Sequence, residues 1–322
     1  MQAIVQDNYG SGNGLELREV ERPSIGEHEV LVRVHAAGVN PADWAVMSGV
    51  PYIARPVYGL RRPKIDVRGT DVAGRVAAVG SAVTRFKPGD EVFGASIGAY
   101  AQYAAASEGE LALKPANLTF EQAATVPMAG LVALQAIRDH GKVSPGQTVL
   151  INGASGGIGT FAVQIAKALG AEVTAVASTR NLELVRSVGA DHVIDYTTED
   201  FTRSGKRYDV ILDNVSNHPL SRLRHSLTAR GVLIPNGGNF GNRWFASAGR
   251  LIRATVLFRF GPQRLGRFLV STNHDDLVAL KELIEAGKVT PVLGGTYPLS
   301  NAGRAIDHVG AGHAQGKVVI TV

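Results

Sequence analysis

The stretch VLINGASGGIGTFAVQIAKALGAEVTAVASTR, residues 149–180, decides the fold. An apolar run at 149–151 leads into a glycine-rich turn, and apolar residues then recur at helical spacing over 161–169. Gly170 ends this segment as a helix C-cap glycine would, and 173–177 has the composition of a second strand. The stretch therefore predicts a strand–helix–strand unit.

The turn inside this unit fits the dinucleotide-binding fingerprint, with alanine at the first glycine position. Gly156 would let the backbone approach a pyrophosphate, and Gly159 would let the helix pack closely on its strand. The helix N-terminus favours the phosphate charge, and the flanking strand and helix are the context that the fingerprint requires. The residues expected at the phosphates are Ala154, Ser155, Gly156, Gly157, Ile158 and Gly159.

The same letters allow a second interpretation. Residues 153–157 also fit G-x-S-x-G, which would make Ser155 the nucleophile of a serine hydrolase. That hypothesis leaves Gly159 and the following strand unexplained, and no downstream histidine stands out as a base for Ser155. Dinucleotide binding is favoured, with the hydrolase and a turn that binds no ligand as the alternatives.

The end of the second predicted strand indicates which dinucleotide binds. NAD sites place an acidic residue here, whereas this chain has Ser178, Thr179 and Arg180. Two hydroxyls and a guanidinium suit a 2′-phosphate, so NADPH is the expected cofactor. The alternative is that Ser178 or Thr179 only caps the helix that begins near Asn181.

Composition limits the class of protein. With 322 residues, of which 45% are apolar, two domains with their own cores are expected. Residues 1–7 do not resemble a signal peptide and no apolar run approaches membrane-spanning length, so a cytoplasmic protein without membrane contact is expected. The chain has no cysteine, which rules out disulfides and Cys-ligated zinc, and its histidines form no H-E-x-x-H cluster. No metal site is predicted.

The net charge of +5 permits anionic ligands or nucleic acid. Arginines gather between Arg243 and Arg267, interleaved with aromatic residues. No recognisable nucleic-acid-binding module accompanies them, so the segment predicts a solvated helical face over an apolar packing face.

Residues 1–118 are predicted to be β-rich, as a partly open barrel or sandwich. The expected strands are 3–5, 15–20, 30–36, 72–79, 91–93, 100–105 and 111–113. A short helix is expected from Pro41 over 42–47, and 49–64 is a candidate loop.

From residue 119 the apolar period becomes helical. Thr119 and Gln122 form a capping box, and Pro127 separates a first helix from a second over 128–140. Beyond the central unit, the alternating elements are strands 193–195, 210–213 and 232–235 and helices 182–188 and 220–227, followed by 275–286 (helix), 296–299 (strand), 302–309 (helix) and 317–322 (strand). This alternation predicts an α/β fold with a doubly wound parallel sheet.

Several motifs occur in a characteristic order: GTDVAGRVAAVG at 69–80, KPGDEVFG at 87–94, AATVPMAGLVALQA at 123–136, the glycine turn, and GKVVITV at 316–322. With them, nearly the whole chain resembles the medium-chain dehydrogenase/reductase superfamily, and within it the zinc-independent quinone oxidoreductases, the family of ζ-crystallin. The resemblance implies a GroES-like catalytic domain at 1–120, rejoined by 288–322, a Rossmann NADP-binding domain at 121–287, and a homodimer.

The chemistry expected without zinc is reduction of an activated acceptor. Alcohol oxidation usually needs a Lewis acid or a Tyr-Lys pair, and no tyrosine here is followed four residues later by lysine. A quinone or an α,β-unsaturated carbonyl spreads the incoming charge onto an oxygen that one or two hydrogen-bond donors can stabilise. The resemblance thus implies an NADPH-dependent quinone or enone oxidoreductase that acts on a small molecule.

The resemblance also implies catalytic roles. Asn40 would lie beside the nicotinamide and offer its amide to the acceptor oxygen, Asp43 would shape the same pocket, and Thr125 would lie near the nicotinamide end. Tyr52, and similarly Tyr58, would stack on the acceptor or deliver a proton. The alternatives are that Asn40 is only a turn residue before a proline and that Thr125 only packs.

Further cofactor contacts are expected where predicted strands end. Asn214, Val215, Gly237 and Gly238 would meet the ribose and nicotinamide, Tyr196 would border the adenine, and Lys317 would approach the cofactor. A non-catalytic NADPH-binding sensor, including one with a nucleic-acid role, stays open as an alternative function.

Overall fold

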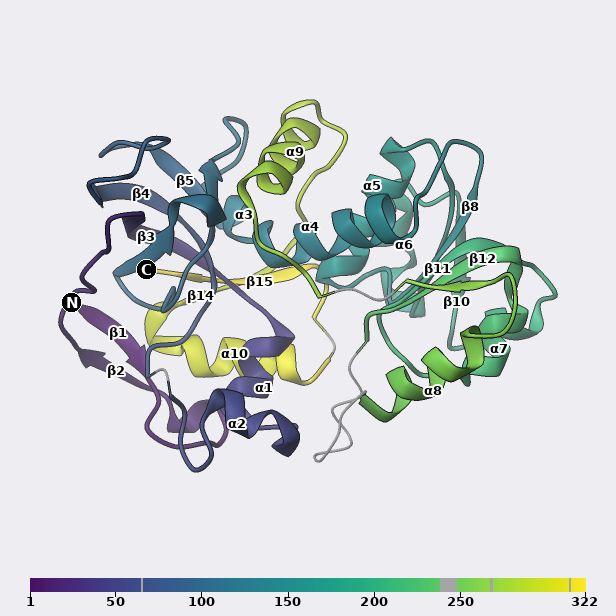
Figure 1. Cartoon of the computed structure of the whole chain (residues 1–322), viewed down its shortest axis with the longest axis horizontal. Coiled ribbons are helices and arrows are strands. Elements are labelled where there is room, and N and C mark those ends of the chain that lie inside the picture. Colours follow the sequence, from purple (N-terminus) through teal and green to yellow (C-terminus); the bar gives the residue numbers. More distant parts are fainter. Residues whose placement is uncertain (65, 238–247, 267–268, 313) are drawn as a thin grey trace. The chain divides into compact units, whose positions relative to one another are not determined.

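The computed structural model describes every residue except 65, 238–247, 267–268 and 313 (Figure 1). The chain divides into two compact units. The first comprises Met1–Leu131, Ser271–Gly287 and Pro291–Val322, and the second comprises Val132–Val270 and Lys288–Thr290.

The first unit is β-rich, as predicted. Its strands are β1 (Gln2–Val5), β2 (Glu16–Glu19), β3 (Glu29–Val39), β4 (Asp71–Val79), β5 (Glu91–Ala95), β6 (Tyr103–Ser107), β7 (Leu111–Leu113), β14 (Leu293–Pro298) and β15 (Lys317–Thr321). Among the described residues, β14-β15-β3-β4-β5-β7 form one sheet in that order, β6 pairs with β3, and β1 and β2 form a separate pair. Apolar and polar side chains alternate in β3, so that Val30, Val32 and Val34 are buried on one face of the sheet whereas Arg33 is exposed on the other.

The helices of the first unit pack around these strands. They are α1 (Pro41–Ser48), α2 (Arg55–Tyr58), α3 (Phe120–Ala124), α9 (His274–Glu285) and α10 (Ala302–Gly310), while α4 (Pro127–Leu134) crosses the division between the units. Helix α1 begins at Pro41, as predicted, and lies beside α10 (Figure 1). The buried face of α10, including Ile306, joins Val318 and Ile320 of β15 in one apolar core.

Two helices lie in a different unit from the one expected. The predicted boundaries at 120 and 287 assign α3 and α9 to the nucleotide-binding domain, whereas both belong to the first unit. Helix α3 packs against β3 and β4, and α9 packs against β7. Gly38 permits the close approach of α3, since a Cβ there would lie 2.3 Å from the Ala124 carbonyl oxygen. The change to a helical apolar period at residue 119 therefore marks the step from strands to a helix. The predicted boundaries of the functional domains stay a prediction.

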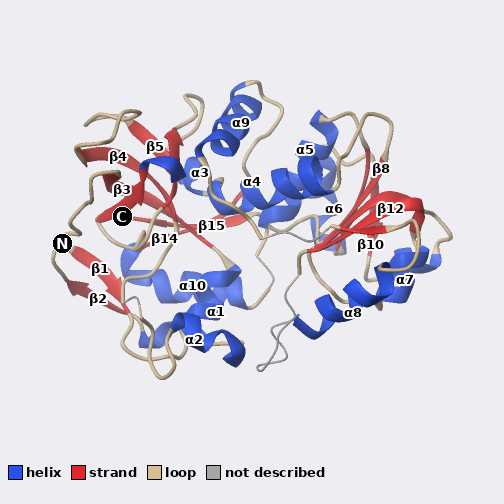
Figure 2. Ribbon diagram, in the orientation of Figure 1, coloured by secondary structure: helices blue, strands red, loops and turns tan. Residues whose placement is uncertain are grey.

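The second unit contains the predicted doubly wound sheet. Its described strands are all parallel, in the order β10 (His192–Asp195), β9 (Glu172–Ala177), β8 (Thr148–Asn152), β11 (Tyr208–Asp213), β12 (Leu227–Pro235) and β13 (Arg264–Leu265). Helices α5 (Gly157–Ala168) and α6 (Leu182–Ser187) cover one face, and α7 (Leu220–His225) and α8 (Ala248–Phe258) cover the other (Figure 2). The strand order reverses between β8 and β11, where open sheets of this kind bind ligands.

Some element boundaries differ from the prediction. Strand β12 begins at Leu227, five residues before the expected start, and its register with β11 shifts between Tyr208 and Val210. The helix expected over 128–140 is α4 followed by a π-helical turn, Gln135–His140. The expected loop at 49–64 contains the short helix α2.

Helix α8 accounts for part of the arginine-rich segment. Ala254 and Phe258 face the core, as a packing face requires. The outer face carries apolar as well as basic side chains, because Ile252 and Val256 are 66% and 62% exposed. Residues 243–247 and 267–268 of this segment lie outside the described residues. Over the part of the chain that is described, no helix has the length and apolar character needed to cross a membrane.

Candidate active site

The glycine turn has the shape that a dinucleotide requires. It joins β8 to the twelve-residue helix α5, and Gly153 adopts a positive φ of 79°. A Cβ on Gly159 would lie 2.2 Å from the Gly153 carbonyl oxygen, so only glycine lets α5 pack this closely on the turn. A Cβ on Gly156 would meet its nearest atom at 3.7 Å, so the surface there is open to a ligand. The turn therefore fits a pyrophosphate at the N-terminus of α5.

The geometry of Ser155 does not support the serine hydrolase. Its Oγ accepts a hydrogen bond from Asn181 Nδ2 at 3.0 Å. An amide donor cannot remove the serine proton, whereas a nucleophilic serine needs an adjacent base. The described non-glycine residues with positive φ are Lys142 and Ser216, so Ser155 does not occupy a strained elbow.

A carboxylate lies beside the predicted 2′-phosphate site. Thr179 Oγ1 donates to Asp195 Oδ2 at 2.5 Å, and the Thr197 amide and hydroxyl donate to Asp195 Oδ1 at 2.9 and 2.7 Å. These bonds lower the pKa of Asp195 and keep it ionised, and the bond from Thr179 has the largest effect. The sequence prediction omits Asp195, although it ends β10 next to β9, and parallel neighbours end at the same sheet edge. Arg180 is exposed at this edge.

The ends of β8 and β11 share a buried carboxylate. Asp213 is fully buried and accepts from Asn152 Nδ2 at 2.9 Å and from the Ser216 amide at 3.0 Å. Arg250 of α8 donates to its other oxygen at 3.0 Å. Asp213 thus fixes the turn that carries Asn214 and Val215, and it ties α8 to the sheet.

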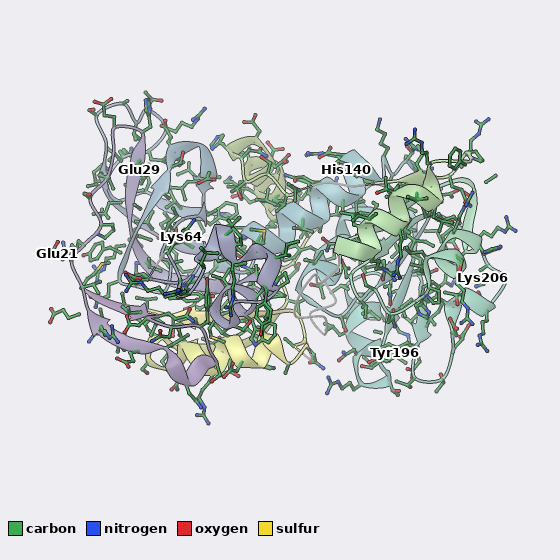
Figure 3. All side chains as sticks on the ribbon, turned by 60° about the horizontal axis from the view of Figure 1, so that its bottom comes forward. Glu21, Glu29, Lys64, His140, Tyr196 and Lys206 are labelled. Carbon is green, nitrogen blue, oxygen red and sulfur yellow. The ribbon has the colours of Figure 1, made fainter. Side chains whose placement is uncertain are left out.

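The turns after β11 and β12, which carry residues predicted to contact the cofactor, lie against each other. Asn236 Nδ2 donates to Asn214 Oδ1 at 2.7 Å, and the Asn214 Nδ2 is buried without a partner. A Cβ on Gly237 would lie 2.6 Å from the Asn214 carbonyl carbon, so the two turns touch. Gly238 lies outside the described residues. Tyr196 follows β10 and is 54% exposed on the second unit (Figure 3).

A second polar cluster lies in the first unit, where β3 runs into α1. Asn40 is only 4% exposed, and its backbone N–H donates to Asp43 Oδ2 at 2.7 Å. The hydroxyl of the buried Tyr100 donates to the same carboxylate oxygen at 2.9 Å. Asp43 therefore holds the first turn of α1 in place through two buried hydrogen bonds.

Lys317 completes this cluster. Its ammonium donates to the Val39 carbonyl at 3.0 Å, to Asn40 Oδ1 at 2.6 Å and to Asp71 Oδ2 at 3.2 Å. The other amide atom, Asn40 Nδ2, is buried and makes no hydrogen bond of acceptable geometry, although the Asn40 amide lies close enough to Asp71 to lower the pKa of that carboxyl. The prediction that Lys317 approaches the cofactor stays untested, and the observed bonds connect it to Asn40. Asp71 and Tyr100 are not predicted from the sequence, although Asp71 stands inside the GTDVAG motif.

Burial controls the protonation of the cluster. It raises the pKa of Asp43 to about 6, against the opposing effect of the bonds from Asn40 and Tyr100. Burial also raises the pKa of Asp71, against the attraction of Lys317, and raises that of Tyr100 well above its usual value. The Tyr100 hydroxyl therefore stays protonated and remains a donor to Asp43.

The other two predicted catalytic residues have structural contacts. Thr125 is fully buried, and its hydroxyl donates to the Gln122 carbonyl at 2.6 Å. Tyr52 belongs to another set of contacts, in which the Arg55 guanidinium lies over the rings of Tyr9 and Tyr52 at 4.8 and 4.6 Å. Catalytic roles for Thr125 and Tyr52 stay predictions. Among the described residues, no group of three acidic or histidine side chains is placed to bind a metal.

Comparison with known proteins matches both parts of the chain. Residues 26–116 match the alcohol dehydrogenase GroES-like domain, and 188–320 match the zinc-binding dehydrogenase family. The chain is 35% identical to quinone-oxidoreductase QR1, chloroplastic, of Triphysaria versicolor, over 99% of this chain and 98% of that protein. It is also 35% identical to an NADPH-dependent alkenal/one oxidoreductase, chloroplastic, of Arabidopsis thaliana, over 99% of this chain and 79% of that protein.

A solved structure shows the same fold over the full length. The quinone oxidoreductase of Escherichia coli, complexed with NADPH, superimposes with a TM-score of 0.84 at 27% identity, with 100% of each chain covered.

Two glycine substitutions test the turn. We expect Gly159→Ala to lower stability by about 1–3 kcal/mol, because its Cβ meets backbone on the far side of the turn. In the matched control, Gly156→Ala, the added Cβ makes only an ordinary contact with the Gly153 carbonyl oxygen at 3.7 Å, so the melting temperature should stay nearly unchanged while NADPH binding weakens. Thermal unfolding and fluorescence titration with NADPH distinguish the two effects. Equal destabilisation by both variants would contradict this account of the turn.

Asp43 predicts a pH dependence of stability. Its folded pKa of about 6 exceeds the reference value of 3.8, so between these values the folded state holds a proton that the unfolded chain releases. Stability from this group therefore falls as pH rises through that window, by on the order of 3 kcal/mol. Asp43→Asn keeps an oxygen for both hydrogen bonds but does not titrate. The free energies of unfolding of the natural protein and of Asp43→Asn should differ most at pH ~7 and less at pH ~4. An equal difference at both pH values would show that Asp43 does not titrate in this range.

Proposed function

Because the chain belongs to the quinone oxidoreductase family of medium-chain dehydrogenases/reductases, we propose that it transfers hydride from NADPH to a quinone or an α,β-unsaturated carbonyl compound. The observation that carries this proposal is the buried Asn40 amide, whose Nδ2 has no partner in the protein. A buried, unpaired donor costs free energy unless a ligand accepts from it. The carbonyl oxygen of the acceptor is the ligand that the proposed chemistry supplies.

NADPH supplies the hydride when it is bound. The protein must then stabilise the negative charge that develops on the acceptor oxygen, and a preorganised donor in a dry site does this effectively. Asn40 is preorganised because its main chain is tied to Asp43 and its amide oxygen to Lys317. In a conjugated acceptor the charge is already delocalised, so one such donor suffices. The proton that completes the reduction comes from water or a nearby hydroxyl.

The cofactor assignment is supported by the second unit and by the relatives. The glycine turn fits a pyrophosphate, one relative is named as NADPH-dependent, and the E. coli structure is a complex with NADPH. Arg180 would pair with the 2′-phosphate, and Ser178 and Thr179 would line it. Asp195 opposes this preference, because its charge lies one hydrogen bond away from Thr179.

The oligomeric state and the cellular location belong to the proposal as well. We propose a homodimer, as the family resemblance implies, and a cytoplasmic location, although relatives of this chain include chloroplastic and mitochondrial proteins. Tyr196, Asn214, Val215 and Gly237 would contact the cofactor at the sheet edge. A sensor that binds NADPH without turnover is the outcome that would replace the enzyme.

Loss of the Asn40 donor should slow the reaction. We expect Asn40→Leu to lower kcat about a hundredfold with quinones or enones, with little change in the affinity for NADPH. NADPH absorbance is followed with ortho- and para-quinones, enones and aldehydes. Asn117→Leu, which removes an amide bonded to the Ile284 carbonyl, is the matched control and should keep wild-type activity. Wild-type turnover by Asn40→Leu would refute the role of this amide, and NADPH binding without any turnover by the natural protein would favour the sensor.

Charge at the end of β9 should set the cofactor preference. Arg180→Ala should raise the Kd for NADPH about tenfold and leave that for NADH unchanged, because only NADPH offers a phosphate. Asp195→Asn keeps an acceptor for Thr179 but removes the negative charge that would repel the 2′-phosphate. NADPH should therefore bind a few-fold more tightly. Titration of both cofactors measures this. A parallel change for NADH and NADPH would place the 2′-phosphate elsewhere.

A further inference from the structure

We infer that Lys317 is a positioning residue that fixes which end of the Asn40 amide faces the acceptor. This inference rests on the proposed function and assigns to Lys317 a task different from contact with the cofactor. Its basis is the buried arrangement of Lys317, Asn40 and Asp71, in which the ammonium donates three hydrogen bonds, one for each of its hydrogens.

Complementarity of donors and acceptors determines the orientation of the amide. An ammonium has three hydrogens and no acceptor, and Lys317 directs them at the Val39 carbonyl, Asn40 Oδ1 and Asp71 Oδ2. If the amide turned over, its NH2 group would face the ammonium, donor against donor. Lys317 is 4% exposed, so water does not replace the lost bond. The amide oxygen is therefore held at Lys317, and Nδ2 is the end of the amide that is left without a hydrogen-bond partner in the protein.

The strand register places this lysine rigidly. Strand β15 is paired with β3, and β3 with β4, so three adjacent strands supply the groups. Val318 pairs with Val39, and Gly38 pairs with Asp71, which brings Lys317 and Asp71 to the end of β3 where Asn40 follows. Neither side chain depends on a loop for its position.

Asp71 makes the buried cation tolerable. Its carboxylate is fully buried, and its second oxygen accepts from the Met128 amide at 3.3 Å. The carboxylate thus neutralises Lys317 and anchors it to the start of α4. The positively charged ammonium of Lys317, which donates to Asn40 Oδ1, also polarises the amide, and this makes Nδ2–H a stronger donor.

The test removes the ion pair as a unit. Lys317→Met alone would leave Asp71 buried and unpaired, so Lys317→Met/Asp71→Asn is used instead. We expect kcat to fall about tenfold while the Kd for NADPH stays unchanged, because the amide is no longer held in one orientation. Lys317→Gln/Asp71→Asn restores a neutral donor to Asn40 and should recover part of the loss. It also carries the test if the methionine variant does not fold.

A double-mutant cycle separates positioning from independent action. If Lys317 acts through Asn40, adding Lys317→Met/Asp71→Asn to Asn40→Leu should lower kcat no further. The matched control is Lys167→Met/Asp191→Asn, which removes an ion pair of the second unit and should leave kcat unchanged. Without cofactor, the side-chain amide NMR signals of Asn40, identified by their loss in Asn40→Leu, should shift in the Lys317 variants and not in the control.

Three results would overturn the inference. The first is a further loss of kcat when Lys317→Met/Asp71→Asn is added to Asn40→Leu. The second is a tenfold weaker binding of NADPH by the Lys317 variants, and the third is that the amide signals of Asn40 do not shift in them. The second would return Lys317 to the cofactor. If Asn40→Leu alone kept full activity, the proposed function would fail before the role of Lys317 arose, so the two failures are distinguishable.

Discussion

A buried ammonium group must find three acceptors, and this requirement organises the candidate site of the first unit. Lys317 takes one acceptor from the backbone of β3, one from Asp71 and one from Asn40. Because all three are buried with it, the cost of the charge is offset only while the three strands keep their register. The unpaired Asn40 Nδ2 is the consequence, since the amide has given its oxygen to the lysine.

The second unit uses a buried carboxylate for a similar purpose. Asp213 gathers Asn152, Ser216 and Arg250 at the point where the strand order reverses. The open surface at Gly156 lies after β8, whose last residue bonds to Asp213. In both units, a buried charged group fixes the position of its polar neighbours, and fixed positions are what preorganised catalysis needs.

The sequence predicts what is local and misses what depends on strand order. The glycine turn, α1 after Pro41 and the parallel sheet follow from spacing and turn chemistry, and Asn40 and Asp43 follow from the resemblance. Asp71, Tyr100 and Arg250 reach partners that are distant in the sequence: Asp71 and Lys317 are 246 residues apart, Tyr100 and Asp43 are 57 apart, and Arg250 and Asp213 are 37 apart. Only the register of β15, β3 and β4 brings Lys317 to Asn40. The membership of α3 and α9 in the first unit is likewise set by packing rather than by local pattern.

The most direct test of the account is a crystal structure of the protein with NADP⁺ and a quinone or enone bound. We expect Asn40 Nδ2 to lie within about 3.2 Å of the acceptor carbonyl oxygen while Lys317 donates to Asn40 Oδ1. An acceptor oxygen bound by other groups, with the Asn40 amide turned or paired elsewhere, would contradict it.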